Sequence, residues 1–507
     1  MDIVESVIFG LTSDEVRRFK ILSNRFKADE EKKLLILFDA IRSEKYADDD
    51  KALVVDLYGE NNAKTRNRYY RLRNKLLDNI EKSLVFYHFK YKDSIHAYYD
   101  IQLSIMFRER GSYRLALYFL KKAEKKAKAL DQFNILEQIY EEYAQLAIKD
   151  IEIDIEKKLE ERKENLRKVE LLRKNTEAIA VITQKLKSSN FSRGKASVIE
   201  LLDKTRQKVE ESAPIFNSPE GKIQLFRTVT ALLLQKEAHP QLVDYLDQTI
   251  AEFEANQLFN NDTHETRLLM RLWLIISLFK VYKFARAGAE LLTFEKEMKL
   301  FNKQNYFTYL FNYYNIKINL LKANGDAKGV EKIIRAALDQ KEIRSRGDNV
   351  CYLLRSLADH QFNSQRFQDA VSTIARLKAE SSYEKLNQEV RLFIEIFEMI
   401  NHFEAGDHAF MENNFKEFKR SFRALLKQEE NAPTKRFLEI LQRMNTAAVE
   451  GRKVSLRAAL KGYKEMTSES EYGDNHIIMY DLYLQSRLEG RPYYELFLEN
   501  TRRRAKR

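Results

Sequence analysis

The scarcity of glycine and proline restricts the fold of this sequence more than any other feature. Only 14 glycines and 5 prolines occur among 507 residues, and no proline precedes Pro214. Average usage would place roughly 60 of these two residue types in a chain of this length. Sheet-rich proteins need both for their turns, whereas helix interiors exclude both. Hydrophobic residues make up 44% of the chain, enough to build a core. The sequence therefore predicts an all-α fold.

The helix boundaries are clearest in the first 92 residues. Apolar side chains at helical spacing predict a helix that begins near Asp29. A short helix over Asp50–Tyr58 is expected to end at Gly59, because glycine is the usual left-handed terminator of a helix. A long helix should follow, from Ala63 to about Phe89. We expect residues 1–92 to form a small N-terminal helical domain.

From about residue 93 onward, a fixed spacing of small and large residues recurs. Its clearest copy is formed by Gly111, Tyr113, Ala116, Leu120 and Ala123. The glycine would end one helix, the alanines would let helices approach closely, and the larger residues would fill the groove between them. Four further copies begin at Tyr282, Gly325, Gln365 and Asn413. The steps between these four positions are 43, 40 and 48 residues.

This spacing resembles the second-helix half of a tetratricopeptide (TPR) repeat, whose period is 34 residues. The resemblance implies a TPR-like helical-hairpin α-solenoid over residues 93–507. It also implies a role in holding a protein or peptide on the solenoid surface.

One charged stretch interrupts the repeated spacing, at about residues 150–175. It is dense in glutamate and lysine. A narrow apolar stripe runs along it, formed by Ile155, Leu159, Leu166 and Val169. Such a stripe predicts a solvated helix lying across the array, or a short two-helix contact.

The net charge of +12 is concentrated in two short segments. Residues 62–82 hold seven lysines and arginines against two acidic residues, and residues 501–507 hold five cations. On a helix, five of the first group fall within about 60° of one another; these are Lys64, Arg68, Arg71, Lys75 and Lys82. An apolar face lies about 120° away; it consists of Tyr69, Leu72, Leu76 and Ile80.

The short helix, Gly59 and the basic helix together resemble a helix-turn-helix, whose second helix enters a DNA major groove. That resemblance implies a nucleic-acid-binding role for the five cations of the basic helix, with Arg502–Arg504 adding phosphate contacts. The alternatives are a solvated basic face or a surface for an acidic protein, and for the C-terminal residues a frayed, soluble end.

The densest aromatic run spans residues 301–314, where seven of fourteen side chains are aromatic. Packing between repeats is one explanation. The other is a concave groove that binds a peptide, since asparagines can clamp peptide amides and rigid aromatics make good anchors. The candidate partner-binding residues are Tyr306, Tyr309, Asn312, Tyr313 and Asn315.

The sequence carries no recognisable enzyme motif, so we expect a non-catalytic protein without cofactor or metal. The histidine pair His402 and His408 could gather metal ligands, but a structural turn is the favoured interpretation. The single cysteine, Cys351, is expected to be a small buried hydrophobe. A signal peptide and a membrane span are not recognised, which favours a cytoplasmic location. The function expected is a protein-interaction scaffold, and the alternative is a nucleic-acid-associated regulator.

Overall fold

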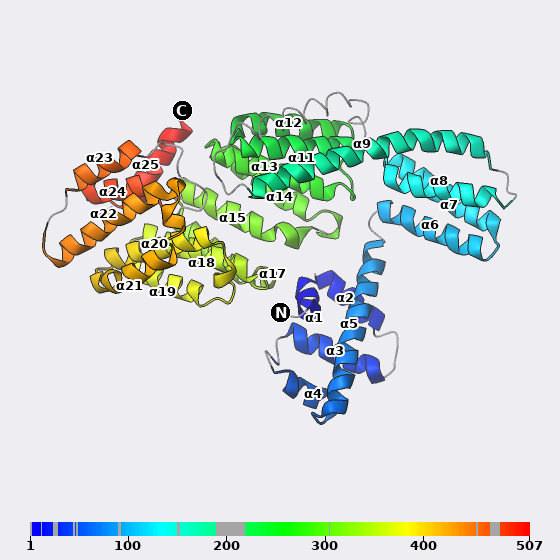
Figure 1. The fold of residues 1–507 in the computed structure, drawn as a ribbon, viewed down its shortest axis with the longest axis horizontal. Coiled ribbons are helices and arrows are strands. Elements are labelled where there is room, and N and C mark those ends of the chain that lie inside the picture. The colour runs from blue at the N-terminus through cyan, green and yellow to red at the C-terminus, as the bar shows by residue number, and fades with distance from the viewer. Residues whose placement is uncertain are drawn as a thin grey trace. The chain divides into compact units, whose positions relative to one another are not determined.

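A computed structural model describes residues 3–11, 13–23, 29–43, 46, 49–89, 93–149, 153–188, 219–303, 305–452, 455–466 and 477–506. Within these ranges every regular element is a helix, as the sequence predicts (Figure 1). The chain divides into two compact units. The first holds residues 1–271 and 300–305, and the second holds residues 272–299 and 306–507.

The first helices of unit one enclose a core of their own. They are α1 (Ile3–Gly10), α2 (Ser13–Ser23), α3 (Asp29–Arg42), α4 (Asp50–Tyr58) and α5 (Ala63–Phe89). All the fully buried residues of this core lie between Val4 and Ile80. The predicted start of α3 and the predicted boundaries of α4 and α5 are confirmed. Gly59 ends α4 in the left-handed conformation, with φ of 81°.

The remaining helices of unit one follow α5, and a second core lies between the first four of them. They are α6 (Asp93–Glu109), α7 (Tyr113–Ala129), α8 (Phe133–Ala147), α9 (Ile155–Ser188), α11 (Pro219–Gln235), α12 (His239–Ala255) and the start of α13 (His264–Lys280). The core between α6, α7 and α8 is filled by alanine, leucine, isoleucine and tyrosine side chains.

The charged helix differs from its prediction. Residues 150–152 lie outside the described residues, and α9 continues to Ser188. Only part of the expected apolar stripe is covered: Leu159 and Leu166 are exposed, whereas Val169 packs against the core of α6, α7 and α8, in which Leu172 is buried. Polar contacts also hold α9 against α8: the Asn165 amide donates to the Phe133 carbonyl at 2.9 Å, and Arg162 donates to Glu137 at 2.7 Å.

Unit two is a succession of helices, and its last helix contacts an early helix of the same unit. Its helices after the end of α13 are α14 (Phe284–Met298), α15 (Tyr306–Asn324), α16 (Ala327–Leu338), α17 (Lys341–Arg344), α18 (Gly347–Asn363), α19 (Phe367–Lys378), α20 (Gln388–Glu404), α21 (His408–Ser421), α22 (Ala432–Val449), α23 (Leu456–Met466), α24 (Tyr480–Glu489) and α25 (Tyr493–Ala505). Tyr494 on α25 donates a hydrogen bond to the Lys322 carbonyl at the end of α15.

One type of turn joins helix to helix repeatedly. A residue with positive φ follows the helix, and the next N–H donates to the carbonyl five residues back, which is the Schellman closure. The Ser112 N–H, for example, donates to the Phe107 carbonyl at 2.8 Å, with φ of 72° at Gly111. The same bond recurs at Lys283–Leu278, Asp326–Leu321, Arg366–Gln361 and Asp407–His402.

The recurring spacing seen in the sequence begins at these turns. Counted from the positive-φ residue, the fifth, ninth and twelfth positions that follow are buried each time. These triplets are Ala116, Leu120 and Ala123; Ala287, Leu291 and Phe294; Val330, Ile334 and Ala337; Ala370, Ile374 and Leu377; and Met411, Phe415 and Phe418. The last copy therefore begins at Gly406, and the predicted start at Asn413 is wrong because Asn413 lies within α21.

The turns offer a direct test of backbone strain. Gln365 holds a φ of 58°, whereas Gly406 holds 79° with open space where a Cβ would stand. Gly406→Ala should lower the free energy of unfolding by about 1 kcal/mol, because left-handed backbone is costly for residues with a Cβ. Gln365→Gly should raise the free energy of unfolding by up to about 1 kcal/mol. Part of this gain is lost because glycine increases the conformational entropy of the unfolded chain.

Urea denaturation followed by circular dichroism would measure both changes. A Gly406→Ala chain that unfolds at the same urea concentration as the unmodified chain would contradict this account of the turns.

Candidate functional site

The aromatic residues predicted for a peptide groove are divided between core and surface. Tyr309 is buried with its ring edge-on to Phe294 at 5.9 Å. Tyr313 is buried as well, and its hydroxyl donates to Glu295 at 2.9 Å while accepting from Lys317. Burial and the bond to Glu295 raise the pKa of the Tyr313 hydroxyl. These two tyrosines therefore hold α15 against α14.

The other members of that predicted set remain accessible on α15. Tyr306 and Asn312 are half-buried, and Asn315 is exposed. The Asn319 amide donates to the Asn315 side-chain oxygen at 3.4 Å. The structure thus places all the predicted residues on one helix, but only Tyr306, Asn312 and Asn315 remain accessible to solvent.

The basic helix predicted from residues 63–82 is the N-terminal part of α5. Its apolar face is confirmed: Tyr69, Leu72, Leu76 and Ile80 are all buried. Of the five candidate cations, Lys75 is half-buried and the other four are exposed. Lys82 pairs with Asp78 at 2.5 Å, and the Arg68 guanidinium lies 4.9 Å from the centre of the Tyr58 ring. Lys64 and Arg71 have no side-chain partner among the described residues.

One cation of this helix is structural. Arg73 is buried, and it contacts Glu5 on α1 at 3.5 Å and Asp50 on α4 at 3.7 Å. It therefore ties three helices of the N-terminal core together and is not part of the exposed ridge.

The basic C-terminal residues form an ordered helix end. Helix α25 extends to Ala505, and Arg504 donates to the Tyr282 hydroxyl at 3.0 Å. The alternative of a frayed end is wrong for residues 501–505, because this contact fixes them within unit two.

The sequence interpretation missed a surface on α7. Leu115 and Tyr118 are 49% and 61% exposed, although both are large apolar residues. Arg114, Lys121 and Lys125 stand beside them and have no side-chain hydrogen bond or ion pair within the described part of the chain. We call these five residues the α7 outer face.

A simple signal would have found this face. At 100° per residue, Arg114, Tyr118, Lys121 and Lys125 lie within about 60° of one another. They also lie about 100–180° from the buried positions Ala116, Leu120 and Ala123. The same repeat spacing that buries one side of α7 therefore turns these side chains outward.

The inner side of α7 is held by paired charges. Asp100 on α6 is fully buried and accepts from Lys122 at 3.0 Å and from Lys126 at 2.9 Å. The Ser104 hydroxyl donates to the Ala116 carbonyl at 2.9 Å. These contacts fix the rotation of α7 on α6, and so they fix which residues face outward.

Glu124, the single acidic residue of α7, belongs to a second charge cluster. Burial opposes its ionisation, but hydrogen bonds from Lys128, Lys158 and Tyr143 outweigh that effect and lower the pKa of its carboxyl. Because Lys158 belongs to α9, the cluster joins α7 to α9. No carboxylate of α7 is thereby left to neutralise the α7 outer face.

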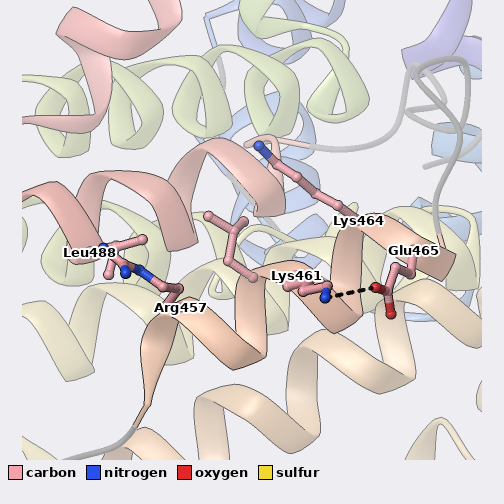
Figure 2. Close-up of a pocket in the computed structure, with 6 residues that line it drawn as sticks. Arg457, Lys461, Lys464, Glu465 and Leu488 are labelled. Atoms are coloured by element: carbon pink, nitrogen blue, oxygen red, sulfur yellow. Dashed lines mark ion pairs between the residues drawn. The ribbon is translucent and has the colours of Figure 1, made fainter.

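A shallow hollow of about 420 Å³ lies between α23 and α24 (Figure 2). Its lining residues are Arg457, Leu460, Lys461, Lys464, Glu465 and Leu488. Lys461 pairs with Glu465 at 3.9 Å, and Arg457 stands beside Leu488 at the other end of the hollow. The hollow is open to solvent, and four of its six lining side chains are charged.

The histidine segment is a structural turn, as predicted. His402 bonds to Asp407 at 2.9 Å and its ring stacks on Phe410, while His408 bonds to the Asn445 side chain. No cluster of potential metal ligands occurs among the described residues. None of the described helices combines the length and hydropathy that a membrane span requires.

Cys351 is a buried core residue, which confirms its predicted role. It is 1% exposed, and burial together with the nearby carboxylates of Glu380 and Asp348 raises the pKa of its thiol to about 11.

We compared the chain with protein-family models, with curated proteins and with solved structures, and none of them matches it.

The anchoring of α7 can be tested at Asp100. Asp100→Asn should destabilise the chain by about 1–3 kcal/mol, because one buried acceptor can no longer satisfy two lysines. Glu109→Gln is the matched control, since it makes the same chemical change at an exposed position of the same helix. Thermal melting would measure both. Equal melting temperatures for the two variants would show that Asp100 does not anchor α7.

Proposed function

We propose that this protein is a non-catalytic, cytoplasmic interaction scaffold, built as a TPR-like α-solenoid behind a small N-terminal helical domain. It would hold a protein or peptide by shape and side-chain anchoring, without bond chemistry.

The observation that carries this proposal is the recurrence of one turn with one burial pattern. A left-handed residue, a Schellman bond and buried residues at the fifth, ninth and twelfth positions occur together seven times among the described residues, after Gly111, Asp131, Glu237, Tyr282, Gly325, Gln365 and Gly406. In a solenoid, each repeat contacts its neighbours and leaves an extended surface free for partners. Each unit offers its own accessible groups for this purpose: the α7 outer face in unit one, and the exposed asparagines of α15 in unit two.

A second candidate function, nucleic-acid binding by α5, is favoured by a separate observation. Lys64 and Arg71 are exposed without a side-chain partner among the residues that the structure describes. Nearby, the Tyr58 ring is approached by Lys33 at 4.6 Å and by Arg68 at 4.9 Å. Clustered cations of this kind can neutralise phosphates, and they require no base-specific contacts to do so.

The two functions predict different responses to charge reversal on α5. Lys64→Glu combined with Arg71→Glu should leave stability unchanged, because neither side chain has a partner to lose. If α5 binds duplex DNA through both cations, the slope of log affinity against log salt should become shallower by about 1.8. Under the scaffold proposal, the partner captured from a native lysate should be retained by this variant.

Affinity capture of the full chain with and without nuclease would decide between them. A defined protein partner that survives nuclease treatment supports the scaffold. Loss of every bound species on nuclease treatment, with nucleic acid in the untreated eluate, would overturn it and support the role of α5.

A further inference from the structure

The α7 outer face is an amphipathic surface with nothing of the described chain against it. Its apolar part, Leu115 and Tyr118, lies one helical turn apart. Its cations stand on both sides along the helix, Arg114 before the apolar pair and Lys121 and Lys125 after it. From Arg114 to Lys125 this face runs for about 16 Å, the length of three turns of a second helix.

The apolar surface continues from Tyr118 toward α6. The Tyr118 ring lies edge-on to Phe119 at 5.2 Å, and Phe119 stacks on Phe107 of α6 at 5.5 Å. Phe107 and Phe119 are both half-buried. An apolar side chain bound beside Tyr118 would therefore contact a continuous aromatic surface formed by two helices.

Charge indicates what kind of molecule fits this surface. The exposed positions of α7 carry only cations, apolar residues and alanine, since Glu124 is buried in its own cluster. A bound molecule must therefore bring negative charge at both ends of the apolar pair. Desolvating Leu115 and Tyr118 additionally requires apolar groups between those charges.

Other anionic classes satisfy these demands less well. Duplex nucleic acid offers phosphates but no apolar groups for Leu115. A membrane surface calls for a wide apolar helix face, and here one leucine and one tyrosine stand among three cations. An acidic amphipathic helix matches the length, the charge and the apolar centre together.

We propose that the α7 outer face binds an acidic amphipathic helix of a partner protein. Apolar side chains of that helix rest on Leu115 and Tyr118, and its carboxylates pair with Arg114, Lys121 and Lys125. This inference rests on the scaffold function and names the chemistry of the partner.

The test uses the full chain and a fluorescein-labelled synthetic helix of about 18 residues, five turns long. The peptide carries leucines on one face and glutamates on its flanks. Fluorescence anisotropy should show saturable binding. Lys121→Glu combined with Lys125→Glu should weaken it on the order of tenfold or more, and Tyr118→Ala should weaken it as well by removing the aromatic anchor.

A matched control is available on α9. Lys163→Glu with Arg173→Glu makes the same charge change at two exposed cations of the same unit, and it should leave the affinity unchanged. The two double variants should have the same melting temperature. If the Lys121/Lys125 reversal fails to fold, Lys121→Gln with Lys125→Gln replaces it.

A charge swap makes the test sharper. A peptide with lysine in place of every glutamate should bind the Lys121→Glu, Lys125→Glu chain more tightly than it binds the unmodified chain. The proposal would be overturned if the α7 double variant and the α9 control variant weakened binding of the acidic peptide equally. It would also be overturned if only phosphatidylserine vesicles or duplex DNA bound in a manner that depends on Lys121 and Lys125.

The proposal can fail without the scaffold function failing. A protein partner captured equally by the unmodified chain and by the Lys121→Glu, Lys125→Glu variant would refute the α7 assignment alone. Absence of any captured protein, together with nuclease-sensitive nucleic acid, would refute both.

Discussion

The hydrogen bond that closes each Schellman turn fixes much of the rest of the structure. It satisfies a carbonyl at the end of one helix, and it holds the reversing residue in left-handed backbone. The next helix then starts at a set distance from that residue, as at Gly111 and Tyr113. Positions five, nine and twelve face inward as a result, and apolar residues from alanine to phenylalanine fill them in the five copies described above. Side-chain identity follows from backbone geometry at these sites.

Local signals allowed much of this fold to be predicted from the sequence. Gly59 and the residues beside it define the end of α4 and the start of α5 through short-range hydrogen bonds, so those boundaries could be predicted. The interface of α9 could be found from apolar periodicity only in part, because Val169 and Leu172 pack against the core but Asn165 and Arg162 join it through polar bonds. The phenylalanines of α21 follow one another at helical spacing, which allows two registers for the last repeat, and a start at Asn413 is the wrong one.

The candidate surfaces show why residue type alone does not predict exposure. Tyr309 and Tyr313 are covered because α14 packs against them, whereas Tyr118 has no described helix on its side of α7. A tyrosine in a helix sequence looks the same in both settings. The position of buried alanines distinguishes them, because the direction opposite Ala116 and Ala123 points away from the packed side.

The burial of Cys351 has a practical consequence for studying this protein. It is the single cysteine of the sequence, and at neutral pH a thiol with a pKa of about 11 is almost entirely protonated. Thiolate is the reactive form, so maleimide reagents would find little to modify in the folded chain. A cysteine introduced at an exposed position would then be the one readily labelled site. Two cysteines introduced on chosen helices could carry fluorophores or spin labels that report the distance between them, without removal of the native cysteine.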